Sequence, residues 1–234
     1  MPDAVFPPWL DRRKHLGIAA RLGSLCGRQM YKRENFALDA EINRTGPAPL
    51  ADLEPPPALA PRELEARARA GALVLDTRPA AQFGAGHIPG AVHIGLVGQY
   101  ASWAGRLARV GMERVAGYLE GGMAAWFGAG LPVAPLAQIT VQDLQRAMDH
   151  VQLVDVRQPG EWEQGHIAGA RLKPLPKLVQ SLDGLDRERP VAVHCKSGYR
   201  SSIAASLLRR EGFGEVVNVI GGFDAWKACG LRVV

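Results

Sequence analysis

The sequence is poor in cysteine and has no long apolar run. Its three cysteines, Cys26, Cys195 and Cys229, are too few and too scattered for a disulfide framework or a structural zinc site. No apolar run reaches the roughly 18 residues of a membrane-spanning helix. The N-terminus, MPDAVFPPWLDRRKH, is interrupted by prolines and carries its cations after its apolar residues, unlike a secretory signal. We therefore expect a soluble, cytoplasmic protein in a reducing environment.

The sequence also lacks any concentration of charge. Its net charge is +5 and its isoelectric point is about 9.4. The excess of basic over acidic groups is +2 in residues 1–70, +1 in residues 71–138 and +2 in residues 139–234. Proteins that bind nucleic acid gather their basic residues on one face or stripe. The spread of charge therefore indicates no nucleic-acid partner and leaves only a weak bias toward small anions; no membrane partner is expected.

Proline divides the chain unevenly. Nine of the 17 prolines lie within the first 61 residues, and such stretches are typical of extended linkers. A short helix is expected near residues 12–22, and good helix formers predict another over residues 62–70. We divide the sequence into a proline-rich N-terminal segment with linker (1–70), a first repeat (71–135) and a second repeat (136–234).

Two copies of one pattern follow the linker. Residues 76–91 and 155–170 are identical at seven of 16 positions, at an offset of 79. GGMAAWFGAGLPV at 121–133 matches GGFDAWKACGLRV at 221–233 at an offset of 100. The first repeat is therefore 21 residues shorter between these two landmarks. Such internal similarity indicates duplicated structural units.

The second repeat alternates segments typical of strands and of helices. Apolar runs predict buried strands over residues 151–156, 190–195 and 215–220. Thr140 and Asp143 form a capping-box pattern at the start of a predicted helix. Helices are expected over residues 141–149, 159–164, 175–182, 201–210 and 221–230. This alternation predicts an α/β fold in which helices flank a parallel sheet.

The most informative motif is HCKSGYRSS at residues 194–202. Cys195 ends a predicted strand, a tight loop follows, and a helix begins near Arg200. The carboxyl ends of parallel strands are where such sheets place ligands. The N–H groups of the loop and of the first helical turn would form an anion cradle. Gly198 would let the backbone turn tightly.

A thiol in such a cradle has chemical consequences. Lys196 and Arg200 stand close to Cys195 in the sequence, and neighbouring cations stabilise a thiolate. Ser201 and Ser202 could cap the helix or donate to the bound anion. The alternative is that Cys195 is an ordinary buried apolar residue, but such a position would need neither cation.

Three motifs occur here in the order found in the rhodanese (sulfurtransferase) family, which the chain resembles. They are DVR…GHIxGA within residues 155–170, Cys-x-Ser-Gly-x-Arg at residues 195–200 and GGFDAW at residues 221–226. The resemblance covers about residues 140–234. Residues 71–133 resemble a second, degenerate rhodanese repeat.

A looser resemblance concerns the N-terminal segment. LGSLCGRQM, RENFAL and the repeat pair are similar to the C-terminal region of fusions between a metallo-β-lactamase-fold persulfide dioxygenase and rhodanese domains. The His-x-His-x-Asp-His motif of the dioxygenase is absent. No dioxygenase chemistry, metal or cofactor is therefore expected.

The rhodanese resemblance implies sulfur transfer. Cys195 would take sulfane sulfur from thiosulfate or a low-molecular persulfide, form a persulfide, and pass the sulfur to cyanide or a thiol. Lys196 and Arg200 would hold the anionic donor, and loop N–H groups would stabilise the persulfide. The substrate-binding residues so implied are Lys196, Ser197, Gly198, Tyr199, Arg200 and Ser201. A homodimer and a sulfur-oxidising enzyme partner are both left open.

Two other functions compete with sulfur transfer. A related phosphatase would need five residues between cysteine and arginine, whereas four separate Cys195 from Arg200; the smaller loop disfavours a phosphoryl group. A non-catalytic binding or docking module is the alternative from another class. The first repeat has no cysteine, and its 21-residue deficit falls where the second repeat carries the catalytic strand and loop. We therefore expect the first repeat to be inactive.

Several residues recur in both repeats and are expected to serve the fold. Asp155 and Arg157 recur as Asp76 and Arg78, which favours a local ion pair or loop clamp that supports the site. The histidine of each GHI motif is expected to fix a loop by hydrogen bonding rather than to act as a base.

Two residues near the motif are assigned to the core. His194 precedes Cys195 on a strand, so its side chain should point to the opposite face. Cys229 aligns with Ala129 of the first repeat, which favours a plain core position over a role as a resolving thiol.

Overall fold

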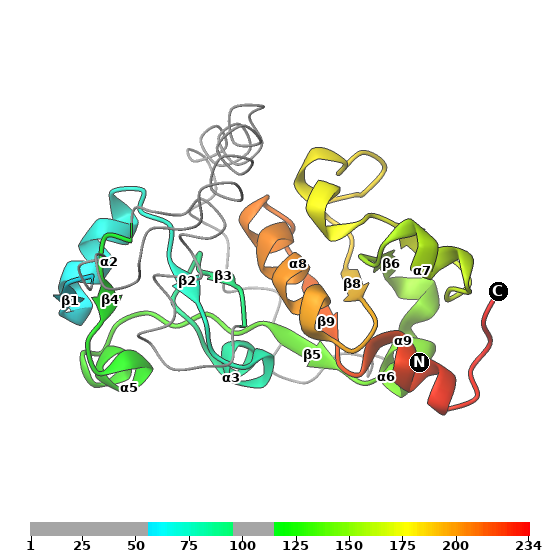
Figure 1. The fold of residues 1–234 in the computed structure, drawn as a ribbon, viewed down its shortest axis with the longest axis horizontal. Helices are drawn as coiled ribbons and strands as arrows, with labels where there is room; N and C mark the ends of the chain where they lie inside the picture. The colour runs from blue at the N-terminus through cyan, green and yellow to red at the C-terminus, as the bar shows by residue number, and fades with distance from the viewer. Residues whose placement is uncertain (1–55, 96–114) are drawn as a thin grey trace, which may run out of the picture.

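The computed structural model describes residues 56–95 and 115–234; Cys26, the helix expected near residues 12–22 and the segment behind the looser resemblance lie outside them. The second repeat forms a five-stranded sheet in the order β5-β9-β8-β6-β7 (Figure 1). All of its strand pairs are parallel. The strands are β5 (Ala137–Ile139), β6 (Gln152–Asp155), β7 (Arg171–Leu172), β8 (Val191–His194) and β9 (Val216–Val219). The predicted α/β fold with a parallel sheet is confirmed.

Helices fill the connections between these strands, and one more helix follows β9, the last strand. They are α6 (Val141–Ala147) with the 3₁₀ turn η3 (Met148–His150), α7 (Pro159–Glu163), the 3₁₀ helix η4 (Leu175–Gln180), α8 (Tyr199–Arg210) and α9 (Gly222–Ala228). The capping box of α6 forms as predicted. The Thr140 hydroxyl accepts from the Asp143 N–H at 3.1 Å, and the Asp143 carboxylate accepts from the Thr140 N–H at 3.0 Å. The segment over residues 175–180 is a 3₁₀ helix rather than an α-helix.

The sheet buries both of its faces. Side chains alternate along β8, so Val191 and Val193 belong to the apolar cluster that contains Leu208 of α8. Ala192 belongs to the opposite cluster, which contains Leu144 of α6 and Trp226 of α9. All of these side chains are buried. Full burial on both faces explains why the strands are continuous apolar runs.

Shorter elements precede the five-stranded sheet. Strand β1 (Ala58–Leu59) and helix α2 (Pro61–Arg69) lie in the segment predicted to be a linker. The first repeat contains β2 (Leu75–Asp76), α3 (Ala80–Ala85), β3 (Val92–His93), β4 (Tyr118–Leu119) and α5 (Gly122–Gly128). Helix α2 confirms the helix predicted for residues 62–70. Strand β1 pairs with β4, and β2 pairs with β3. Within the described residues these form two separate two-stranded parallel sheets, as suits a shortened repeat.

The two landmarks of each sequence repeat meet in space. In the first repeat the N–H and carbonyl groups of His87 and Ala134 exchange hydrogen bonds at 2.9–3.0 Å. In the second repeat His166 and Val234 exchange the equivalent pair at 2.8–3.0 Å. The tryptophans of α5 and α9 each donate to a carbonyl six residues later, at 2.9 Å. The repeat seen in the sequence is therefore a repeat of structure.

The repeats share apolar packing. Leu59 of β1, together with Phe83 and Trp126 of the first repeat, belongs to the same cluster as Val191 and Leu208 of the second repeat. Helix α8 lies between β3 and the five-stranded sheet (Figure 1), and α3 packs against β5. The division after residue 135 thus separates two sequence repeats whose apolar side chains pack together.

Candidate active site

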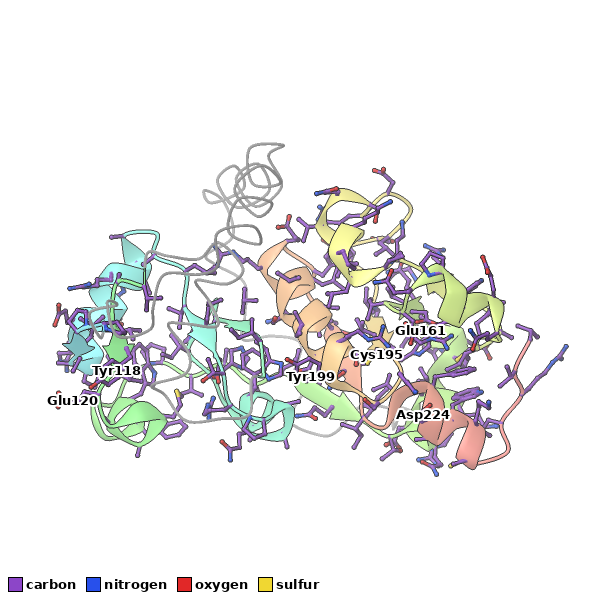
Figure 2. The ribbon with its side chains drawn as sticks, viewed as in Figure 1. Tyr118, Glu120, Glu161, Cys195, Tyr199 and Asp224 are labelled. Carbon is purple, nitrogen blue, oxygen red and sulfur yellow. The ribbon has the colours of Figure 1, made fainter. Side chains whose placement is uncertain are left out.

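Cys195 lies where the sequence motif predicts. It follows β8, a central strand, and precedes α8, whose first residue is Tyr199. The side chain is 1% exposed. In Figure 2 it lies between Tyr199 and Glu161 in projection. The thiol is therefore at the carboxyl end of a parallel strand and next to the N-terminus of a 12-residue helix, a favourable place for an anion.

Two hydrogen-bond donors reach the sulfur. The Gly198 N–H donates to the Cys195 Sγ at 3.2 Å, and the Ser201 hydroxyl lies 3.5 Å from the same sulfur. Gly198 has φ +101°, a left-handed conformation that glycine adopts without steric cost. The loop thus curls around the thiol, as the cradle hypothesis requires. Such donors stabilise a sulfur that carries negative charge.

Helix α9 holds the back of the loop. The Phe223 N–H donates to the Cys195 carbonyl at 2.8 Å, and the Asp224 N–H donates to the Lys196 carbonyl at 2.9 Å. In a trans peptide the N–H points opposite to the carbonyl. The N–H groups of Lys196 and Ser197 therefore point away from α9. The first turn of α9 orients the loop by satisfying its carbonyl groups.

Arg200 does not stand free beside the sulfur. Its two terminal nitrogens donate to the two carboxylate oxygens of Glu161 at 2.6 and 2.7 Å. The hydrogen bonds from Arg200 lower the pKa of Glu161 from 4.5 to about 2. The same contact raises the pKa of the Arg200 guanidinium. Sequence reasoning missed Glu161, which lies in α7, 39 residues earlier.

Asp155 and Arg157 form the ion pair that the recurring motif predicts. The Arg157 Nη2 donates to the Asp155 carboxylate at 2.6 Å and to the Gly165 carbonyl at 3.0 Å. The guanidinium also stacks on the Phe223 ring, with its carbon 4.0 Å from the centroid. Both charged side chains are buried. The pair therefore joins β6 to the start of α9, behind the loop that carries Cys195.

The first repeat contains the same clamp. The Arg78 Nη2 donates to Asp76 at 2.6 Å and to the Gly86 carbonyl at 2.7 Å. Presence of the clamp in a repeat without a cysteine supports its structural role.

The histidines also occupy structural positions. The ring of His87 stacks on Phe83, with its Nδ1 2.9 Å from the Phe83 carbonyl. The ring of His166 stacks on Trp162 in the same way, with an Nδ1 to carbonyl distance of 3.4 Å. His194 is fully buried, and burial lowers its pKa. These observations agree with the predicted hydrogen-bonding and core roles.

The first repeat reaches α8 at three points. The Tyr199 hydroxyl donates to the Ile94 carbonyl at 2.6 Å. The His93 N–H donates to the Ser206 hydroxyl at 3.0 Å, and Arg210 donates to the Gly90 carbonyl at 3.3 Å. The α8 residues are seven and four positions apart, which places them on one helix face. The segment around β3 therefore runs along the helix that begins at the cradle.

The structure corrects two of the predictions made from the sequence. Ser201 and Ser202 do not cap α8, because Gly198 is the N-cap and no side-chain cap forms. Ser201 instead faces the Cys195 sulfur. Cys229 is not in the core but exposed, and it is the C-cap residue that follows α9.

Of the substrate-binding residues expected from the motif, the structure gathers Gly198 and Ser201 at the sulfur. Lys196 and Ser197 are exposed on the loop. Tyr199 turns to the first repeat and Arg200 to Glu161.

The described residues contain no group of three or more His, Cys, Asp or Glu side chains suited to a metal ion. Over the same ranges, no helix has the length and apolar character needed to cross a membrane.

Comparisons with known proteins identify similar sequences and structures. A family model described as a rhodanese-like domain matches residues 60–103 and 140–229. Thiosulfate sulfurtransferase GlpE of Coxiella burnetii is 37% identical over 93 residues, 40% of this chain and 86% of that protein. An uncharacterised Bacillus subtilis protein, YqhL, is 40% identical over 88 residues, 38% of this chain and 70% of that protein. A rhodanese-related protein of Thermoplasma volcanium has a crystal structure that is 33% identical, with a TM-score of 0.40, covering 42% of this chain and 97% of that one.

Proposed function

Because the chain belongs to the rhodanese-like family, we propose that it is a sulfurtransferase. Cys195 takes sulfane sulfur from thiosulfate or a low-molecular persulfide and delivers it to a thiophilic acceptor. The observation that carries the proposal is the loop around Cys195, in which the Gly198 N–H donates to the sulfur at 3.2 Å. A relative that is 37% identical bears the name thiosulfate sulfurtransferase.

In the first half-reaction the Cys195 thiolate attacks the outer sulfur of thiosulfate. A new S–S bond forms to Cys195, the S–S bond of thiosulfate breaks, and sulfite leaves with the electron pair. In the second half-reaction cyanide or a thiolate attacks the terminal sulfur. The Cys195 thiolate is released, together with thiocyanate or a new persulfide. No external oxidant or reductant is needed, and the covalent intermediate leads to ping-pong kinetics.

The groups around Cys195 stabilise the negative charges of the donor and of the persulfide intermediate. The terminal sulfur of the persulfide is anionic, and loop N–H groups directed away from α9 stabilise it without reorganisation. Lys196, exposed on the loop, meets the anionic donor, and Arg200 adds a second cation at the start of α8. Asp155 and Arg157 support the loop from behind and touch no substrate.

The experiment is mass spectrometry of the protein after incubation with thiosulfate. We expect one added sulfur atom on Cys195 and thiocyanate formation when cyanide follows. Cys195→Ser should lose both, because an oxygen cannot carry the sulfane sulfur. Cys229→Ser is the matched control, since Cys229 is an exposed thiol outside the loop, and it should keep both.

Two results would contradict the proposal. Turnover retained by Cys195→Ser would remove Cys195 as the nucleophile. An unmodified Cys195 in a folded protein would favour the alternative, a rhodanese-like binding or docking module without turnover.

A further inference from the structure

Lys196 and Arg200 are the two cations expected at the cradle, and one of them is paired with a carboxylate from outside the motif. Glu161 binds Arg200 end-on, with each terminal nitrogen donating to a different carboxylate oxygen at 2.6 and 2.7 Å. The two side chains are 27% and 31% exposed, so the pair reaches the surface. Of the two motif cations, only Lys196 is outside this ion pair.

Glu161 is held in place independently of Arg200. Its carboxylate also accepts from the Gln158 N–H at 3.0 Å, which completes the capping box of α7. Its carbonyl accepts from Arg157 at 3.3 Å, so the buried clamp fixes the same turn. Because the pKa of Glu161 is about 2, its negative charge is present at neutral pH. The carboxylate is therefore a permanent part of the site's charge.

We propose that Glu161 is a specificity-determining residue that favours singly charged sulfur donors over doubly charged ones. The inference rests on the sulfurtransferase function proposed above. With Glu161 in place, Lys196 and Arg200 together present one net positive charge, which suits a persulfide or another monoanion. Thiosulfate carries two negative charges, so the Glu161 carboxylate repels it more strongly than it repels a monoanion. This repulsion offsets part of the attraction between thiosulfate and Arg200.

The experiment compares two donors that differ by one charge. Thiosulfate is a dianion and methanethiosulfonate is a monoanion, and both donate sulfane sulfur to cyanide. The readout is the ratio of kcat/KM for thiosulfate to kcat/KM for methanethiosulfonate. Glu161→Gln removes the charge and keeps the shape and the capping group. We expect the ratio to rise about three- to tenfold at low salt, the effect of one charge in a partly exposed site. The gain should shrink at high salt.

Two further variants test the cause. Glu163→Gln removes an equal charge from an exposed position on the same helix and should change the ratio by less than twofold. In an Arg200→Met background, Glu161→Gln should still raise the ratio, because the carboxylate repels the second charge of thiosulfate whether or not Arg200 is present. A purely structural role would lower kcat/KM for both donors alike and leave their ratio unchanged.

Failure of this inference is distinct from failure of the proposed function. If the wild-type protein transfers sulfur from both donors and Glu161→Gln leaves the ratio unchanged or lowers it, the charge-selectivity inference is overturned alone. If neither donor yields thiocyanate with the wild-type protein, the sulfurtransferase function itself is overturned.

Discussion

Gly222 offers a direct test of how α9 positions the loop that carries Cys195. Its φ is +53°, and a Cβ added there would lie 2.4 Å from the Cys195 carbonyl oxygen and 2.8 Å from that of Lys196. Such distances force backbone to move, since both atoms belong to the loop. Gly222→Ala should therefore displace the loop from α9 while leaving every catalytic side chain present.

The first repeat supplies the matched control. Gly122 occupies the equivalent turn with φ +58°, and a Cβ there would meet no heavy atom within 4 Å. Alanine at either position pays about 1–2 kcal/mol for the left-handed conformation. Gly222→Ala adds about 1–3 kcal/mol of overpacking. We expect free energies of unfolding to fall by about 2–5 kcal/mol for Gly222→Ala and by about 1–2 kcal/mol for Gly122→Ala.

The two variants should differ more in activity than in stability. A misplacement of about 1 Å can cost a factor on the order of 100 in rate, so kcat for sulfur transfer should fall about 100-fold in Gly222→Ala and little in Gly122→Ala. Urea unfolding and thiocyanate formation measure the two quantities. Equal loss of stability in both variants, or a wild-type rate in Gly222→Ala, would refute the view that contact with α9 sets the loop.

Three further changes test the surroundings of the site. Asp155→Asn should lower the free energy of unfolding by about 3–5 kcal/mol, because its partner Arg157 stays buried without a counter-charge. Asp76→Asn should lower it by less, since its partner Arg78 is 23% exposed. Equal losses of stability in urea titrations of the two variants would argue against burial as the cause. Tyr199→Phe should cost about 0.5–1.5 kcal/mol through loss of the hydrogen bond to the Ile94 carbonyl, and an unchanged urea midpoint would show that this link adds nothing. The pKa of Glu161 in the folded protein is about 2, below its ordinary value of 4.5, so its stabilising effect is complete above pH 4.5 and is lost as the pH falls toward 2. Melting temperatures over that window should fall more in the wild type than in Glu161→Gln, and identical curves would contradict this.

Local sequence signals predicted the parts of the fold that depend on near neighbours. The capping box at Thr140, the proline start of α7 and the apolar runs of β6, β8 and β9 all involve residues close in sequence. The sequence did not predict the two outer strands of the five-stranded sheet. Strand β5 is Ala137–Ile139 and β7 is Arg171–Leu172, too short to show a period of two. Their strand geometry comes from pairing with β9 and β6.

In the candidate site, too, contacts between residues close in sequence were predicted and contacts between distant residues were not. Cys195, Gly198 and Ser201 lie within seven residues of each other, so the motif placed them together. The contact between Glu161 and Arg200 spans 39 residues, and that between Tyr199 and Ile94 spans 105. No local spacing encodes such pairs, because they depend on how α7 and the first repeat pack against α8. The charge of the site was therefore the property least accessible to sequence reasoning.

Comparison of the two repeats separates residues that serve the fold from those proposed for the chemistry. The first repeat keeps the Asp76–Arg78 clamp, the His87 bridge and the left-handed turn at Gly122. At that turn a hollow of about 230 Å³ is lined by Tyr118, Leu119, Gly121 and Gly122. At the equivalent turn of the second repeat, backbone N–H groups donate to carbonyls of the loop that carries Cys195. Each retained feature forms its own hydrogen bonds without that loop. Their persistence in a repeat without a cysteine is what a structural role requires, and it leaves Cys195 and its loop as the features on which the proposed sulfur transfer depends.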